Sequence, residues 1–243
     1  MKIALIGYGK MGKVIEQIAL SKGHTISYKI DIENSTDIKL IKPSNTDVAI
    51  EFTSPHTAFE NVKSLLNNGV AVVCGSTGWH DQLPEAQKLC KEKGAAFLWT
   101  SNFSIGVNLF FKLNEQLARL MNGIDGYEPI MTEIHHIHKK DAPSGTAITL
   151  AEGLLKHYKK FTHWALKIKR MKAKDKQNAL LIESRRKSEV PGTHIIQYNS
   201  NEDYINITHF AKGRRGLALG AVIAAEYIKG KKGIFSMNDV LSF

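Results

Sequence analysis

The sequence has no apolar run long enough to form a membrane-spanning helix, which needs about 20 consecutive apolar residues. The N-terminal run at residues 3–6 ends after a few residues at a glycine-containing loop. That run is also too short for the apolar core of a signal peptide, so we interpret it as a strand of the folded protein. These observations predict a cytoplasmic protein with no membrane partner.

Cysteine is scarce, with only two in 243 residues. Cys74 ends an apolar run, and Cys90 lies in a helix-like stretch. We interpret both as small buried or half-buried thiols, which is the common state of free cysteine. A reducing cytoplasm is consistent with this interpretation.

Acidic residues are outnumbered, with 23 Asp and Glu against 33 Lys and Arg, a formal net charge of +10. This excess favours anionic partners such as nucleotides, carboxylates or nucleic acid. Much of it lies between Lys156 and Lys176, a stretch that is also typical of a solvated surface. Because the sequence has no helix-turn-helix, basic zipper or interleaved aromatic pattern, we expect no nucleic-acid partner.

The first hundred residues alternate between strand-like and helix-like segments. Helix-like segments separate several of the apolar runs, which predicts a parallel, doubly wound α/β sheet of Rossmann type. The predicted strands are 2–6, 25–31, 47–52, 70–74 and 95–99, and the predicted helices are 10–21, 56–67 and 81–93.

The second half of the chain has a different pattern, typical of an α+β domain with antiparallel strands and helices on one face. We expect helices at 106–122 and 144–158, and strands at 129–137, 179–186, 193–199 and 204–210 with a hairpin turn at 199–203. The first of these helices carries a predicted buried stripe of Val107, Phe110, Leu113, Leu117 and Leu120. A last helix at 216–229, rich in small residues, is expected to pack back on the first domain.

A G-x-G-x-x-G motif follows the first strand directly and begins the first helix. It consists of Gly7, Tyr8, Gly9, Lys10, Met11 and Gly12. Its glycines permit a tight turn, a close approach to a pyrophosphate and tight helix–strand packing, and the helix N-terminus favours an anion. Asp31, at the end of the second strand, is expected to bind the adenosine ribose hydroxyls.

Asp31 also bears on the choice of cofactor, which we expect to be NADH, with some use of NADPH. Its carboxylate would repel a 2′-phosphate, and Ile32 follows where an arginine would favour NADPH. Lys10, inside the loop, would still reach a phosphate. Further cofactor-binding residues are expected in loops at the carboxyl ends of later strands. These are Phe52, Thr53, Gly75, Ser76, Thr77, Ser101, Asn102 and Phe103.

Residues 133–147 contain three histidines and two lysines before an Asp-Ala-Pro turn and a Ser-Gly-Thr helix start. The N–H groups of Gly145 and Thr146 would face an anion such as a carboxylate, and the histidines and lysines supply protons. Structural histidines are one alternative. A zinc site is another, but His135, His136 and His138 lie in an extended stretch without a Cys or HExxH pattern, so we expect no metal.

The segment from His135 to Ala147, with the pattern H-H-x-x-K-x-D-A-P-S-G-T-A, resembles the signature of the dihydrodipicolinate reductases. The resemblance extends through Gly7–Gly12, Gly75–Gly78, residues 102–104 and the end of the chain at Gly220–Leu241. It therefore covers nearly the whole sequence. The departures are small: Ser76 stands in a loop that is often all threonine, and the stretch after Asp31 is compact.

The resemblance implies NAD(P)H-dependent reduction of 4-hydroxy-tetrahydrodipicolinate, with loss of water, in lysine biosynthesis through diaminopimelate. It implies that His135 is the general acid, that Lys139 is its proton-donating or charge-stabilising partner, and that His136, Gly145 and Thr146 hold the substrate carboxylates. Arg214 would contact substrate or cofactor. Residues 1–106 and 214–243 would form the dinucleotide-binding domain and residues 107–213 the substrate-binding and oligomerisation domain of a homotetramer, with hinges near 104–107 and 211–215.

Two other functions are consistent with parts of the sequence. One is a different Rossmann reductase acting on a small dicarboxylate, such as an amino-acid dehydrogenase, against which the His135–Ala147 segment argues. The other is a nucleic-acid-binding or regulatory protein that senses NAD, which the basic charge would favour. Since both the expected substrate and cofactor are anionic, the charge requires no nucleic acid.

Overall fold

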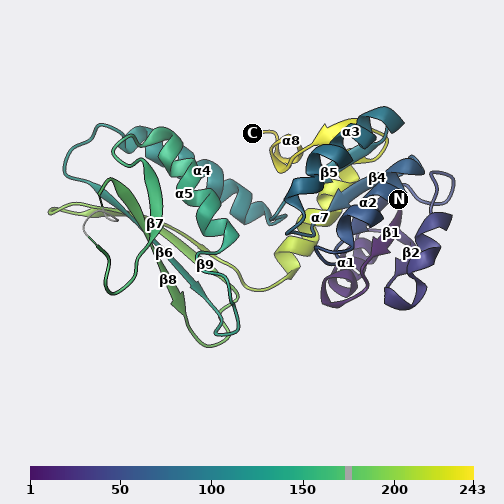
Figure 1. Cartoon of the computed structure of the whole chain (residues 1–243), viewed down its shortest axis with the longest axis horizontal. Helices are drawn as coiled ribbons and strands as arrows, with labels where there is room; N and C mark the ends of the chain where they lie inside the picture. Colours follow the sequence, from purple (N-terminus) through teal and green to yellow (C-terminus); the bar gives the residue numbers. More distant parts are fainter. Residues whose placement is uncertain (173–176) are drawn as a thin grey trace. The chain divides into compact units, whose positions relative to one another are not determined.

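The computed structural model describes residues 1–172 and 177–243, which form two compact units (Figure 1). The first unit consists of Met1–Ile105 and Arg214–Phe243, and the second of Gly106–Gly213. The last part of the basic stretch predicted between Lys156 and Lys176, at residues 173–176, lies outside the described residues. Among the described residues, no helix is both long and apolar enough to cross a membrane.

The first unit contains a six-stranded sheet in which every strand pair is parallel, as the alternating pattern predicted. The strand order is β11-β5-β4-β3-β1-β2. The strands are β1 (Lys2–Ile6), β2 (Thr25–Ile30), β3 (Val48–Glu51), β4 (Ala71–Cys74), β5 (Ala96–Trp99) and β11 (Gly233–Phe235). Because β1 lies between β2 and β3, the chain reverses its direction of winding there, which is where ligands bind in open α/β sheets.

Helices cover both faces of this sheet. The side chains of β1 alternate: Ile3 and Leu5 pack with α1 and α7, whereas Ala4 and Ile6 pack with α2 and α3. The helices are α1 (Lys10–Ser21), η1 (Ile32–Leu40), α2 (Ala58–Asn67), η2 (His80–Gln82), α3 (Leu83–Lys93), α7 (Arg215–Ile228) and α8 (Met237–Leu241). The prediction that the last long helix packs on the first domain is confirmed, since α7 contributes to its core.

Both cysteines are free thiols buried in this unit, as predicted. Cys74 donates a hydrogen bond to the buried Glu51 carboxylate, with Sγ 2.9 Å from Oε2. Burial, together with this carboxylate, raises the pKa of the Cys74 thiol well above its usual value. Burial likewise raises the pKa of Cys90. Neither thiol is therefore an activated nucleophile.

The second unit contains a five-stranded sheet of order β10-β9-β6-β8-β7. Its strands are β6 (Glu128–His135), β7 (His163–Leu166), β8 (Ala179–Arg186), β9 (Thr193–Asn199) and β10 (Tyr204–Phe210). The expectation of purely antiparallel strands is wrong, because β6, β8 and β7 pair in parallel. The connections between these strands are long enough to cross over the sheet, which parallel pairing requires.

Helices α4 (Ile105–Met121) and α5 (Gly145–His157) both pack on one face of this sheet (Figure 1). The predicted buried stripe of α4 is partly wrong, because Leu113 and Leu120 are exposed. The buried face instead continues from Val107 and Phe110 through three other positions, Asn114, Ala118 and Met121. These positions recur at the 3.6-residue helical period, and the leucines lie one residue out of phase with them.

Candidate active site

A pocket of about 380 Å³ lies at the carboxyl ends of β1, β2 and β3 in the first unit. It brings together five of the predicted cofactor-binding residues: Gly7, Gly9, Asp31, Phe52 and Thr53. It also includes residues that were not predicted to bind cofactor, namely Ile6, Ile30, Ile32, Ser35, Ser54, Thr57 and Asn61. Most of these flank the predicted residues by only a few positions, so proximity along the chain was the available signal.

The glycine loop has the geometry that a dinucleotide site requires. Gly7 has φ +92°, and a Cβ there would lie 2.2 Å from the Phe52 carbonyl oxygen. A Cβ at Gly12 would lie 2.3 Å from the Gly7 carbonyl oxygen, so this glycine permits the tight turn onto α1. At Gly9, by contrast, a Cβ would meet none of the described residues within 4 Å. The backbone at Gly9 is therefore open toward a ligand.

The first turn of α1 also fits an anion. Gly9, its N-cap, has no side chain to accept from the helix N–H groups, and the turn carries Lys10 but no acidic residue. The unpaired N–H groups of a helix N-terminus and its partial positive charge favour a phosphate. The loop residues Tyr8 and Met11 instead pack toward the core of the unit.

Asp31 lies at the exposed rim of the pocket as the N-cap of η1. Its Oδ1 accepts a hydrogen bond from the Ile32 N–H at 2.9 Å. The neighbouring Ile32 side chain is 90% exposed, an unusual state for an apolar residue and one that offers a flat ring an apolar surface. The 3₁₀ helix η1 is the compact stretch after Asp31 and was not predicted.

The loop after β4 is attached to this pocket through Ser76, whose Oγ accepts from the Thr53 N–H at 2.8 Å. Gly75 lies against the Phe52 ring, where a Cβ would come within 2.2 Å of the ring carbons. Phe103 is buried beside Phe52, with ring centroids 5.8 Å apart. The Phe103 side chain is part of the core, so Phe103 could contact the cofactor only through its backbone.

The remaining predicted cofactor residues of the first unit lie at the ends of other elements. Thr77 follows Ser76 in the loop after β4, and Ser101 and Asn102 follow β5. Asn102 accepts a hydrogen bond from the Ser104 N–H at 2.9 Å, which fixes this turn before α4. Arg214 is the N-cap of α7. None of these four residues lines the pocket described above.

In the second unit, β6 carries a buried carboxylate and a buried imidazole on one face. Glu133 is fully buried and His135 is nearly so, because side chains two apart on a strand share a face. His135 Nδ1 lies 3.3 Å from Glu133 Oε2, although the angle is outside that of a hydrogen bond. On the neighbouring strands, Glu133 is paired with Ser184 and His194, and His135 with Arg186.

The start of α5 is attached to the same cluster. Ser144, its N-cap, accepts a hydrogen bond from the Ala147 N–H, and its own N–H donates to Glu133 Oε2 at 3.0 Å. Its hydroxyl also lies 3.1 Å from His194 Nε2. Burial, reinforced by the nearby His135, lowers the pKa of His194 to about 4, so His194 is neutral at neutral pH. The helix begins as predicted, with Gly145 and Thr146 in its first turn.

The loop between β6 and α5 contains the other predicted residues. Lys139 Nζ donates to Asp141 Oδ1 at 2.9 Å. Burial opposes ionisation of Asp141, but this hydrogen bond, a backbone hydrogen bond and the charge of Lys139 together outweigh it and lower the pKa of Asp141. His136 Nδ1 is buried and has no hydrogen-bond partner among the described residues. His138 is exposed and pairs with Glu189, 3.2 Å away, so it lies apart from the cluster.

Family models match both units of the chain. The dihydrodipicolinate reductase N-terminal family model matches residues 1–103, and the C-terminal model matches residues 106–241. The chain belongs to the dihydrodipicolinate reductase family. It is 46% identical to the 4-hydroxy-tetrahydrodipicolinate reductase of Christiangramia forsetii over 100% of this chain and 98% of that protein. It is 34% identical to the reductase of the same name from Methanocaldococcus jannaschii, over 98% of this chain and 80% of that protein.

The fold is also that of a solved member of the family. A dipicolinate-bound dihydrodipicolinate reductase from Paenisporosarcina sp. TG-14 superimposes with a TM-score of 0.75 and 21% identity, covering 98% of both chains. The family reduces 4-hydroxy-tetrahydrodipicolinate with NAD(P)H in lysine biosynthesis, and the chain is an oxidoreductase with this activity.

Four members of the cluster around Glu133 were not recognised as site residues from the sequence: Glu133, Ser184, Arg186 and His194. Glu133 precedes the histidine pair by two residues, which was a usable signal. The other three lie on β8 and β9, more than 40 residues later in the chain. Only the pairing of these strands with β6 brings them to Glu133, and the alternation of a strand does not reveal its neighbours.

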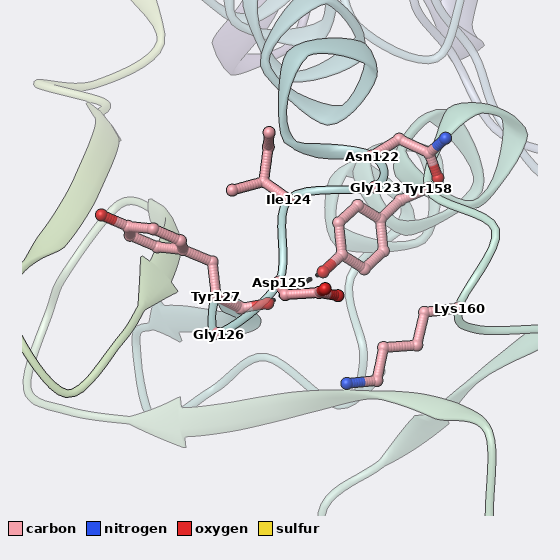
Figure 2. Close-up of a pocket in the computed structure, with 8 residues that line it drawn as sticks. All are labelled: Asn122, Gly123, Ile124, Asp125, Gly126, Tyr127, Tyr158 and Lys160. Atoms are coloured by element: carbon pink, nitrogen blue, oxygen red, sulfur yellow. Dashed lines mark hydrogen bonds between the residues drawn. The ribbon is translucent and has the colours of Figure 1, made fainter.

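A second pocket lies elsewhere in this unit, with a volume of about 270 Å³. It is lined by Asn122, Gly123, Ile124, Asp125, Gly126, Tyr127, Tyr158 and Lys160, none of which is a predicted site residue. Figure 2 shows the Tyr158 hydroxyl directed at the backbone carbonyl of Tyr127, to which it donates at 2.9 Å. This hydrogen bond joins the end of α5 to the start of β6, which indicates a structural role.

Proposed function

We propose that the reductase activity is divided between the two domains of the chain. Residues 1–106 with 214–243 bind NAD(P)H, and residues 107–213 bind the dicarboxylate substrate and supply its proton. One observation carries this division: the glycine loop lines an open pocket in the first unit, whereas the buried acid–base cluster belongs to the second. When bound, the reduced nicotinamide supplies a hydride to the substrate.

His135 is the general acid in this proposal. Its imidazole is nearly buried beside an anionic partner, an environment in which a proton can be held and delivered in a defined direction. Lys139 is its partner, placing a cationic Nζ where negative charge develops as the conjugated imine is reduced. The hydrogen bond from Lys139 to Asp141 supports this role, because it restrains a flexible side chain before substrate binds.

The substrate carboxylates are held by His136 and by the backbone N–H groups of Gly145 and Thr146. The buried, unpartnered Nδ1 of His136 is available to a polar ligand group. The start of α5 adds the partial positive charge of its dipole, as predicted for an anion site. The dipicolinate named with the Paenisporosarcina reductase is a dicarboxylate, which is consistent with this assignment.

The cofactor is held by the loop Gly7–Gly12, with its pyrophosphate at the N-terminus of α1 and its ribose hydroxyls on Asp31. Phe52, Thr53 and the loops at 75–77 and 101–103 complete the site. Arg214 contacts substrate or cofactor. NADH is preferred and NADPH is also used, because the Asp31 carboxylate disfavours a 2′-phosphate.

The chain assembles as a homotetramer through the second sheet. α4 and α5 cover one face of that sheet, and the opposite face carries the exposed side chains of Ile130, Tyr204 and Phe210. Burial of such a face in a symmetric interface is favourable. The enzyme acts in the cytoplasm, where two free thiols remain reduced.

A substrate panel tests the proposed reaction. A synthase would make the cyclic substrate in situ from pyruvate and aspartate semialdehyde, and the absorbance of NADH and NADPH would report turnover. We expect oxidation of both cofactors, faster with NADH, and no comparable turnover with oxaloacetate plus ammonia. Binding of NADH without turnover of the cyclic substrate would contradict the proposal and favour another dicarboxylate.

A further inference from the structure

Glu133 is a fully buried carboxylate to which the acid–base scheme above assigns no role. Burying a lone carboxylate costs several kcal/mol, so such a group persists only where it is well paired. Burial alone would raise the pKa of Glu133. The close approach of His135 and the hydrogen bonds from Ser144 and Ser184 together outweigh burial and hold that pKa well below its usual range. Glu133 is therefore anionic at neutral pH.

One carboxylate oxygen, Oε2, joins the general acid to the anion-binding helix. It accepts the Ser144 N–H at 3.0 Å and lies 3.3 Å from His135 Nδ1. A carboxylate beside Nδ1 favours the proton on that nitrogen, which leaves Nε2 as the nitrogen that exchanges protons with substrate. Nε2 lies on the side of Gly192, where a Cβ would come within 3.1 Å of it.

The other oxygen, Oε1, joins the cluster to the loop that carries Lys139. It accepts from Ser184 Oγ at 2.8 Å and lies 3.4 Å from both terminal nitrogens of Arg186. Arg186 in turn donates to the Lys139 carbonyl at 3.2 Å and to the Asp141 carbonyl at 2.6 Å. The Arg186 guanidinium therefore connects the backbone of the Lys139 loop to the buried Glu133 carboxylate.

We propose that Glu133 is the positioning residue of the active site, which fixes the His135 ring, the start of α5 and the Lys139 loop relative to one another. The proposal rests on the assignment of His135 as the general acid. Since side-chain displacements of about 1 Å can cost 100-fold in rate, the carboxylate affects turnover far more than ground-state binding.

A metal ion is the other explanation of this cluster, because ligand atoms of Glu133, His135 and His194 lie within 4.8 Å of one another. Two observations argue against it. Both carboxylate oxygens already accept hydrogen bonds from protein donors, and the Arg186 cation lies 3.4 Å from Oε1. A divalent ion would have to displace these donors and withstand the charge of the guanidinium.

A double-mutant cycle between Glu133→Gln and His135→Gln tests the proposal. In the wild-type background we expect Glu133→Gln to lower kcat about 100-fold with little change in the KM for NADH. In the His135→Gln background the same change would cost about tenfold or less, because only its effects on the start of α5 and on the Lys139 loop remain. Equal losses in both backgrounds, or restoration of activity by added zinc, would overturn the proposal.

Two further variants keep the test decisive. Glu183→Gln removes a half-buried carboxylate of β8 that pairs with Arg185, and we expect it to leave kcat unchanged. If Glu133→Gln does not fold, Glu133→Asp retains the buried charge but withdraws it from His135, and the same cycle applies. Absence of turnover in the wild type would refute the proposed function, whereas normal wild-type turnover with an additive cycle would refute only the role of Glu133.

Discussion

The two candidate sites of this chain are built in opposite ways. The pocket of the first unit consists of glycines, small polar side chains and apolar side chains such as Ile32 and Phe52, at the ends of three adjacent parallel strands. The site of the second unit consists of a buried carboxylate, two imidazoles and a guanidinium drawn from β6, β8 and β9. The first would bind its ligand through shape and helix polarity, whereas the second would direct protons through fixed charge.

This difference determines how each site can be damaged. In the first site a methyl group added at Gly7 or Gly12 is enough to destabilise the fold, because the neighbouring backbone already lies in contact with these glycines. In the second site a change of charge with little change in volume is enough, because the remaining charges would be buried without partners.

The largest effect is expected for Gly12→Ala, and Gly9→Ala is its matched control. A Cβ at position 12 would lie 2.3 Å from a carbonyl oxygen, so we expect Gly12→Ala to lower the free energy of unfolding by about 3 kcal/mol or more. Gly9→Ala meets no described neighbour, so its stability should change by less than about 1 kcal/mol while NADH affinity falls about tenfold. Urea denaturation and NADH titration measure the two. Equal stability of the two variants would contradict the packing argument.

The charged site should give the protein an acid sensitivity that originates at His194. Its folded pKa of about 4 is below the ordinary value of 6.5, so the unfolded state binds the proton first as pH falls. The contribution of His194 to the free energy of unfolding is therefore fully present above pH 6.5 and is lost as the pH falls to about 4. The loss is on the order of 3 kcal/mol. Glu133 also loses its contribution in acid, but only below its ordinary value of 4.5.

The free energy of unfolding, measured at pH 7 and at pH 5, separates the contribution of His194 from that of Glu133. Of these two groups, only His194 titrates between pH 4.5 and pH 6.5. We expect His194→Gln to reduce the pH dependence in this interval, leaving the smaller part that comes from the half-buried His209, whose pKa burial also lowers. A variant that retained the full slope would show that the acid sensitivity has another origin.

The smallest effect is expected at the rim of the first pocket. Asp31→Asn preserves an acceptor for the Ile32 N–H but removes the charge that opposes a 2′-phosphate. We expect the ratio of kcat/KM for NADPH to that for NADH to rise about tenfold, equivalent to roughly 1.4 kcal/mol. An unchanged ratio would mean that the carboxylate does not face the ribose.

The contrast between the sites also explains what the sequence could predict. The doubly wound sheet and the glycine loop were predictable because they depend on local patterns: apolar strands, a strand–loop–helix motif and an acid at the next strand end. The short strands β7 and β11 and the 3₁₀ helix η1 were missed, since segments this brief carry little periodicity.

Features that depend on which strands pair could not be predicted from the sequence. The parallel pairs β6–β8 and β7–β8 could not be derived from alternation alone. The pairing of β6 with β8 brings Ser184 and Arg186 to Glu133, and the pairing of β6 with β9 brings His194, which is why these three residues were missed. The prediction of the buried face of α4 was partly wrong for a related reason. The leucines fit the helical period, but tertiary packing buries the face that includes Asn114, whose side-chain amide donates a hydrogen bond to the Leu150 carbonyl.

The most direct test of the division between the two units is a pair of measurements on one preparation of His135→Gln: the Kd for NADH and kcat with the cyclic substrate. Exposed His138→Gln is the matched control. The division predicts a Kd within about twofold of the wild type and a kcat reduced about 100-fold or more, with both values unchanged in the control. A weakened Kd with a preserved kcat would contradict it, because His135 would then act in cofactor binding rather than in proton transfer.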